Sequence, residues 1–225
     1  MTGGVQLRGE RGHSIPAAIG FGYVVRGRPF VIRLVVLGIV AVLSAGALGI
    51  KTRHPDAHPL PPLPGAAQVT AHIVRGGQPA DFDLLRLRNA YHVRAVVNLR
   101  LSGDSERDIA AGFGLDYLSV PVAADGAPTA ADLAALVTFV RRYDNGSAVV
   151  YVHDDVGGGR AATAGLMLLL LRGQSFGAVM TTLSATDQRR LNSHQWGALV
   201  ALSQALTEHV DPAVNPYHEA VALRW

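Results

Sequence analysis

The sequence predicts a three-layer α/β domain with a central, mostly parallel sheet, preceded by one transmembrane helix. Over residues 66–225, β-rich runs alternate with helical patterns, which is typical of a parallel sheet covered by helices. Two of these runs, Val93–Leu99 and Ala148–His153, are almost continuously apolar. This pattern is typical of strands that are buried on both faces of a parallel sheet. Nearer the N-terminus, residues 34–50 carry no formal charge, which predicts the membrane segment.

The composition excludes several classes of function. Hydrophobic residues make up 49% of the chain and charged residues only 16%, whereas ordinary soluble domains carry about 25% charged residues. The chain contains no cysteine, which excludes disulfides, thiolate metal ligands, iron–sulfur clusters and a cysteine nucleophile. The net charge of +3 is small for a nucleic-acid-binding protein, so we expect no nucleic-acid partner.

Residues 30–50 are expected to form a single-pass membrane anchor. As a helix they would extend about 31 Å, enough to cross the hydrocarbon core of a bilayer. Five arginines precede the uncharged run 34–50, namely Arg8, Arg11, Arg26, Arg28 and Arg33. By the positive-inside rule, residues 1–29 are therefore expected in the cytoplasm, and the globular domain in the periplasm or outside the cell. The Ala45–Ala47 stretch (AGA) leaves a cleaved signal peptide as the alternative. Residues 51–65 are rich in proline and predict a stiff linker.

Residues 66–225 are expected to form one domain with its own core. Strands are predicted at Val69–Val74, Val93–Leu99, Tyr117–Val122 and Ala148–His153. Helices are predicted at Asp81–His92, Asp104–Phe113, from Thr129 onward, Ala161–Leu171, Ser175–Leu183 and Leu191–His209. Thr129 and Asp132 have the spacing of a capping box, which marks the start of a helix. Ala161–Leu171 is apolar on all sides and is therefore expected at the centre of the domain.

The most informative stretch is a glycine-rich turn, residues 153–160 (HDDVGGGR), between a buried strand and a buried helix. Successive backbone N–H groups in such a turn form a concave anion-binding nest, and the helix N-terminus adds the positive end of its dipole. Arg160, at the start of the helix, is suited to binding two oxygens of a phosphate. The alternative is a strand–helix turn that happens to be rich in glycine and binds nothing.

The loop resembles the His-Cys-x5-Arg signature of the cysteine-dependent protein tyrosine and dual-specificity phosphatases. His153, Gly157 and Arg160 match its histidine, internal glycine and phosphate-binding arginine. Upstream, residues 75–79 (RGGQP) are similar to the R-S-G-Q-P opening of the compact bacterial and fungal members. Residues 96–100 (VVNLR) are similar to their V-I-D-L-R strand.

Two further segments extend this resemblance in the expected order. Residues 117–122 (YLSVPV) and 127–129 (APT) are similar to the next strand and helix start of the family. The resemblance covers residues 68–172 and implies a phosphatase-like fold for the domain. It also implies the phosphate-binding positions, which are Asp155, Val156, Gly157, Gly158, Gly159 and Arg160.

Three departures from the family concern its chemistry directly. Asp154 stands at the position of the nucleophilic cysteine, Ala161 at that of the serine or threonine that assists the thiolate, and Ala162 at that of a usual glycine. The family mechanism is attack by the thiolate to form a cysteinyl-phosphate, which water then hydrolyses. That route is closed here, because a carboxylate replaces the thiolate and no other cysteine exists.

Asp154 is expected to lie at the floor of the nest as a resident anion. Hydrogen bonds from the loop N–H groups and the guanidinium of Arg160 would both stabilise its ionised form. An ionised Asp154 facing Arg160 would occupy part of the pocket and repel an incoming phosphate. The resemblance further implies that His153 orients the loop through hydrogen bonds.

Asp125 falls where the family keeps its general-acid aspartate, on the loop after the third predicted strand. The alternative is an ordinary surface residue of an Asp-Gly turn. Adjacent side chains rarely converge on one ion, so we expect no metal site at His153, Asp154 and Asp155. We also expect no cofactor.

Taken together, the sequence predicts a membrane-anchored phosphatase-like protein that has lost catalysis, a pseudophosphatase. Its partner would be a phosphorylated or otherwise anionic ligand bound by the loop. The alternative function is an active phosphohydrolase that uses Asp154 as its nucleophile, with a divalent metal ion.

Overall fold

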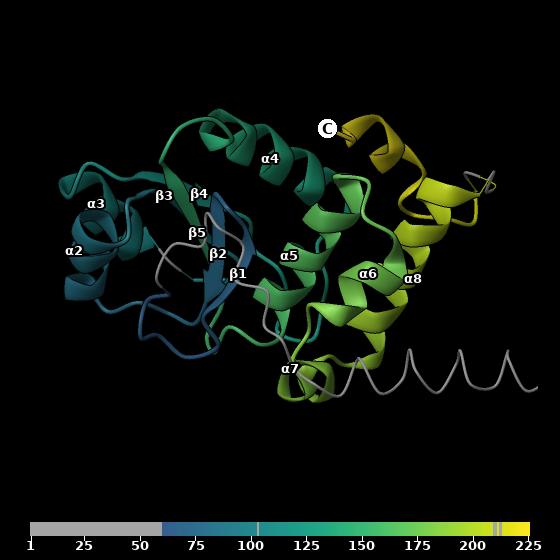
Figure 1. The fold of residues 1–225 in the computed structure, drawn as a ribbon, viewed down its shortest axis with the longest axis horizontal. Helices are drawn as coiled ribbons and strands as arrows, with labels where there is room; N and C mark the ends of the chain where they lie inside the picture. The colour runs from purple at the N-terminus through teal and green to yellow at the C-terminus, as the bar shows by residue number, and fades with distance from the viewer. Residues whose placement is uncertain (1–59, 103, 209–210, 212) are drawn as a thin grey trace, which may run out of the picture. The chain divides into compact units, whose positions relative to one another are not determined.

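The computed structural model describes residues 60–102, 104–208, 211 and 213–225 (Figure 1). The expected cytoplasmic segment (1–29), the membrane anchor (30–50) and most of the linker (51–65) lie outside the described residues. Among the helices that the structure does describe, none has the length and apolar character needed to span a bilayer.

A five-stranded sheet forms the centre of the domain, in the order β1-β2-β5-β3-β4. The strands are β1 (Ala67–Thr70), β2 (Ile73–Gly76), β3 (Val93–Asn98), β4 (Asp116–Ser119) and β5 (Val149–His153). All neighbouring pairs are parallel except β1 and β2. The predicted mostly parallel sheet is therefore confirmed.

The first predicted strand is wrong, because Val69–Val74 is not continuous. The chain turns at Ala71 and His72, so that β1 and β2 form an antiparallel hairpin. The backbone N–H of His72 donates to Thr70 Oγ1 at 3.2 Å, a local bond that competes with a continued strand. Apolar residues on both sides of the turn conceal it from a pattern based on hydrophobicity.

Helices cover both faces of the sheet, which confirms the three layers (Figure 1). On one side lie α2 (Asp81–Ala90) and α3 (Asp104–Gly112). The other side is covered by α4 (Ala130–Val140), α5 (Arg160–Leu171), α6 (Phe176–Thr181), α7 (Ala185–Arg190) and α8 (Ser193–Thr207), with 3₁₀ turns η1 (Arg141–Tyr143) and η2 (His218–Leu223). Helix α5 is buried at every residue, as its apolar sequence predicts.

Capping side chains mark the N-terminal ends of α4 and α7. Thr129 caps α4, with its Oγ1 accepting from Asp132 N–H at 3.2 Å, so the predicted capping box is confirmed. Helix α7 was not predicted. It has only six residues, and Ser184 caps it by accepting from Asp187 N–H at 3.1 Å.

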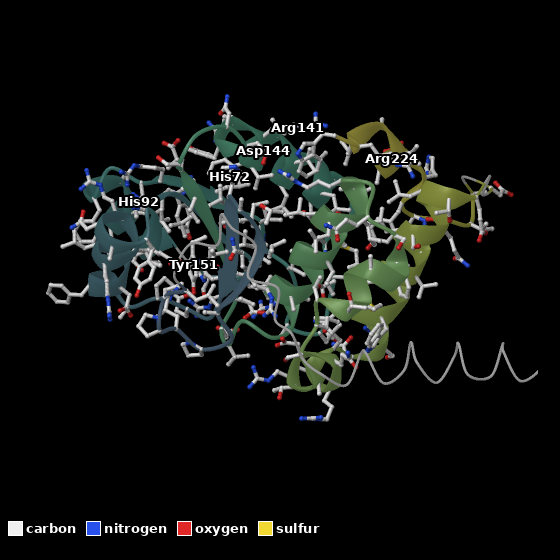
Figure 2. The ribbon with its side chains drawn as sticks, viewed as in Figure 1. His72, His92, Arg141, Asp144, Tyr151 and Arg224 are labelled. Atoms are coloured by element: carbon white, nitrogen blue, oxygen red, sulfur yellow. The ribbon has the colours of Figure 1, made fainter. Side chains whose placement is uncertain are left out.

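The C-terminal segment is attached to the end of α4 (Figure 2). Arg141 donates to the carbonyls of Leu223 and Arg224, at 3.1 and 2.9 Å. The indole N–H of Trp225 donates to Asp144 at 3.0 Å. These contacts close the helical layer over the apolar core.

Three parallel strands end at the same edge of the sheet, where the glycine-rich loop begins. His153 at the end of β5 is in register with Gly76 of β2 and Asn98 of β3. Carboxyl ends of parallel strands are where open α/β folds place their ligand sites. The sheet therefore presents the loop at this edge.

Candidate functional site

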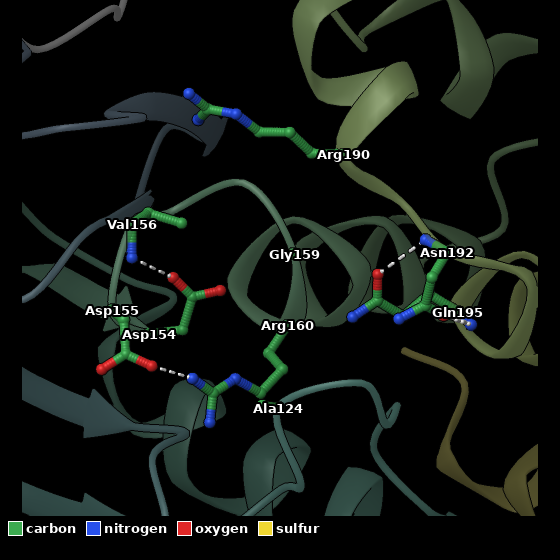
Figure 3. A pocket seen from close by; sticks show the side chains of 9 residues that line it. All are labelled: Ala124, Asp154, Asp155, Val156, Gly159, Arg160, Arg190, Asn192 and Gln195. Carbon is green, nitrogen blue, oxygen red and sulfur yellow. Dashed lines mark hydrogen bonds and ion pairs between the residues drawn. The ribbon is translucent and has the colours of Figure 1, made fainter.

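A pocket of about 470 Å³ opens over the loop between β5 and α5 (Figure 3). Its walls come from that loop, from the segment before α4 and from the region of α7 and α8. The lining residues are Ala124, Asp154, Asp155, Val156, Gly159, Arg160, Arg190, Asn192 and Gln195. Four of the predicted loop positions and the predicted nucleophile position therefore line one cavity.

Gly157 gives the loop its curvature. Its φ is +77°, and a Cβ there would lie 2.6 Å from the carbonyl carbon of Gly76 and 2.7 Å from the nitrogen of Gly77. Val156 forms an isolated bridge with Gly77, which brings the loop against the residues after β2. Only glycine fits both the left-handed backbone and this close approach.

The carboxylate of Asp154 occupies the floor of the loop. Its Oδ1 accepts from the backbone N–H groups of Val156, at 2.9 Å, and of Gly157, while Oδ2 accepts from Ala161 N–H at 3.0 Å. The residue is only 2% exposed. The side chain thus takes hydrogen bonds from three N–H groups of the nest, as expected for a resident anion.

Arg160 does not pair with Asp154, which corrects the expectation that these two side chains face each other. One guanidinium nitrogen of Arg160 donates to the carbonyls of Leu99, at 3.2 Å, and Val122, at 3.0 Å. The other pairs closely with Asp155. The hydrogen bonds of Asp154 turn its carboxylate into the loop, and Arg160 pairs with the neighbouring Asp155 instead.

Asp155 bridges two arginines. Its Oδ1 accepts from Arg100 Nε at 2.6 Å, and its Oδ2 pairs with Arg160. Burial alone would raise the pKa of the Asp155 carboxyl, but hydrogen bonds and charges from Arg100 and Arg160 outweigh it, and the pKa is lowered. Asp155 is therefore an ionised partner, supplied by the loop itself, for the arginine that the resemblance assigns to phosphate.

Asp125 lies outside the pocket. Its side chain is 75% exposed, and its carboxylate is 4.0 Å from His194 Nδ1. The neighbouring Ala124 lines the cavity in its place. The arrangement corresponds to the surface-turn alternative for Asp125 and gives it no contact with Asp154 or Arg160.

His153 is fully buried behind the loop, in a polar cluster at the ends of β3 and β5. Its Nε2 is 3.1 Å from Glu106 Oε1, and Glu106 Oε2 accepts from Asn98 Nδ2 at 2.8 Å. The His153 ring stacks on Tyr151, with 5.9 Å between the ring centroids. The cluster lies at the strand end from which the loop departs, and neither ring nitrogen of His153 makes a hydrogen bond to the described residues of the loop.

Several residues of the site were missed from the sequence. Arg75 donates to the carbonyl of Gly157 and pairs with the buried Asp187 at 2.8 Å, so it holds the loop to α7. Gln195 is buried and donates to Gly126 O at 3.1 Å. Arg190 lines the pocket, and both its Cδ and its guanidinium lie close to Gly158 (Figure 3).

The signals for these residues were weak or absent. The family resemblance at residues 75–79 contained Arg75, although nothing in the pattern indicated its ion pair. Arg190 and Gln195 are far from the loop in the chain, and their contribution depends on how α7 and α8 pack. In the part of the chain that the structure describes, no three acidic or histidine side chains come together as a metal site.

Comparison with known proteins agrees with this geometry. The family model of PTP-like phytases, described by the words inositol hexakisphosphate, matches residues 82–172. This stretch runs from α2 through the loop to the end of α5. No curated protein sequence matches the chain.

Solved structures share the arrangement of the domain. A DUF442 protein from Shewanella putrefaciens CN-32 aligns with a TM-score of 0.51 and 22% identity, over 66% of this chain and 96% of its own. PTPMT1 aligns with a TM-score of 0.54 and 20% identity, over 71% and 97%. Tk-PTP in its active form aligns with a TM-score of 0.52 and 22% identity, over 63% and 97%.

At these identities the likeness shows the fold alone. The chain therefore has the fold of the cysteine-dependent protein tyrosine and dual-specificity phosphatases, while containing no cysteine.

Proposed function

We propose that this protein is a pseudophosphatase: it does not hydrolyse phosphate esters, and its loop serves as a site for a phosphorylated or otherwise anionic ligand. The observation that carries the proposal is the engagement of the Asp154 carboxylate by three backbone N–H groups, those of Val156, Gly157 and Ala161. The position of the nucleophile is thus filled by a group that itself accepts the hydrogen bonds of the loop.

The other catalytic positions support the loss of hydrolysis. Ala161 offers no hydroxyl to assist a leaving group, and Asp125 lies at the surface. Arg160 is paired with Asp155. Each of the three groups that the family mechanism would use is therefore absent or engaged elsewhere.

A ligand-binding role is supported by what the loop keeps. The backbone N–H groups of Gly158, Gly159 and Arg160 donate no hydrogen bond to any described residue, and Gly159 and Arg160 line the pocket at the start of α5. PTPMT1, which shares the fold, has been solved in complex with PI(5)P. We propose a phosphorylated ligand for this chain on these grounds.

Turnover measurements test the loss of catalysis. The full-length protein is incubated with para-nitrophenyl phosphate, with and without Mg²⁺, beside its Asp154→Asn variant. We expect no release of nitrophenol above the buffer control under either condition. Metal-dependent turnover that disappears in Asp154→Asn would overturn the proposal and establish Asp154 as a nucleophile.

The proposal also includes a single-pass anchor at residues 30–50 with the N-terminus in the cytoplasm, resting on the distribution of arginines. A reporter enzyme that works only outside the cytoplasm, fused after Trp225, should be active in cells. A reporter active only in the cytoplasm would reverse this orientation. A mature protein that begins near Leu48 would replace the anchor with a cleaved signal peptide.

A further inference from the structure

Asp155 holds the position of an anionic ligand between two arginines. Each of its carboxylate oxygens meets a different guanidinium, Oδ1 that of Arg100 at 2.6 Å and Oδ2 that of Arg160. Such paired contacts are the ones that arginines also make to phosphate oxygens. A side chain of the loop itself therefore provides the negative charge at this point.

Both arginines are held by contacts that do not involve Asp155. Arg160 is 5% exposed, and its other nitrogen is held by the buried carbonyls of Leu99 and Val122. Arg100 is steadied by Gln78 Oε1, which accepts from it at 2.8 Å. The guanidinium of Arg160 is thus fixed by contacts that do not involve Asp155.

Asp155, in contrast, can leave at low cost. Its side chain is 53% exposed, so an ionised carboxylate that rotates outward is readily hydrated. Its rotation breaks the pairs with Arg100 and Arg160, while its backbone carbonyl remains bonded to Gln78 N–H at 3.3 Å. Asp155 is therefore the displaceable member of the bridge.

We propose that Asp155 is a tethered competitor for the anion site, so that a phosphate group binds by displacing the Asp155 side chain from Arg100 and Arg160. The inference rests on the proposed ligand-binding function and adds its regulation. The displaced state leaves the guanidinium of Arg160 without its carboxylate partner in the pocket, which Gly159 also lines. Asp154 stays in the floor of the loop throughout.

The test measures phosphate affinity when the competitor loses its charge. Inorganic phosphate is titrated into the full-length protein and its Asp155→Asn variant by calorimetry at fixed ionic strength. Asparagine keeps the size of the side chain but presents an amide N–H₂ to one of the arginines, so the bridge is lost. We expect phosphate to bind Asp155→Asn at least about fivefold more tightly, which corresponds to about 1 kcal/mol.

A matched control separates local competition from total charge. Glu219→Gln also removes one negative charge, from a residue whose carboxylate pairs with His218 at 3.8 Å and with no other residue in the described part of the chain. Its phosphate affinity should equal that of the unchanged protein. Adding Arg100→Gln to Asp155→Asn should cancel part of the gain, because Arg100 would then no longer meet the phosphate.

The outcomes distinguish this inference from the proposed function. Equal phosphate affinity in Asp155→Asn and the unchanged protein, or an equal gain in Glu219→Gln, would overturn the competitor role of Asp155. Asp155→Ser provides a second variant, and circular dichroism verifies the folding of both. Turnover of an aryl phosphate by the unchanged protein would instead contradict the proposed loss of catalysis and leave the competition result standing.

Discussion

The carboxylate of Asp154 accepts a hydrogen bond from the backbone N–H of Ala161 at 3.0 Å. This contact joins the nucleophile position of the phosphatase fold to the first turn of α5, at the positive end of the helix dipole. A thiolate in the same place would be stabilised in the same way. The loop therefore retains the environment that a nucleophile needs while holding a carboxylate.

Restoring the nucleophile should restore part of the chemistry. We expect Asp154→Cys to release about one nitrophenol per protein in a burst, because the helix N-terminus and loop N–H groups lower the pKa of a thiol there. Ala161→Ser should then raise the steady rate more than the burst, by assisting the second step. Rapid-mixing absorbance measurements follow both phases.

The exposed position of Asp125 adds a control to this experiment. Asp125→Asn should leave the burst unchanged, since its carboxylate faces His194 and not the pocket. A burst that becomes slower in Asp125→Asn would show that this loop closes over the substrate. A folded Asp154→Cys/Ala161→Ser protein without any burst between pH 5 and 8 would show that further positions have lost their function.

The buried ion pair between Arg75 and Asp187 should dominate the stability of the loop region. Both side chains are largely buried, and Arg75→Met would leave the Asp187 carboxylate without its cation. We expect the free energy of unfolding to fall by about 3–5 kcal/mol, measured by urea denaturation. The double variant Arg75→Met/Asp187→Asn should lose less than the sum of the single variants, and strict additivity would contradict the coupling.

Gly157 should tolerate no side chain. Gly157→Ala places a Cβ 2.6 Å from backbone atoms at a φ of +77°, and we expect a loss of more than about 3 kcal/mol in the free energy of unfolding. Gly114 is the matched control, with a φ of +67° and no atom within 4 Å of the added Cβ. Gly114→Ala should cost only about 1–2 kcal/mol. Equal losses would mean that the close approach to Gly76 contributes nothing.

Asp155 should make stability depend on acid pH. Its pKa is lowered in the folded protein, so its contribution is present above the unfolded value of about 3.9 and is lost as the pH falls through the folded value. Because the side chain is half exposed, the contribution is below about 1 kcal/mol. The difference in Tm between the protein and Asp155→Asn should therefore shrink from pH 6 to pH 2, and a constant difference would contradict the ionised bridge.

The sequence was informative where burial is continuous along the chain. The apolar run before His153 and the apolar helix after Arg160 locate β5 and α5, and hence the loop between them. Asp154 was expected to accept the loop N–H groups, and it does. Short-range patterns contain this information because the strand, the turn and the helix are adjacent in the sequence.

Features that depend on torsion angles or distant packing could not be predicted in this way. Which of two neighbouring aspartates turns inward is decided by the backbone of the loop, and so Arg160 pairs with Asp155 where Asp154 was expected. A one-residue difference likewise places Ala124 in the pocket and Asp125 outside. Gln195 enters the site only because α8 packs beside it.

The occupation of the anion nest by Asp154 is tested most directly by the phosphate affinity of Asp154→Ser. Serine removes the negative charge and frees the N–H groups of Val156, Gly157 and Ala161 for an incoming oxyanion. Calorimetric titration of the full-length variant with inorganic phosphate should give a dissociation constant at least about fivefold below that of the unchanged protein, about 1 kcal/mol in affinity. Equal or weaker phosphate binding by a folded Asp154→Ser protein would contradict the account.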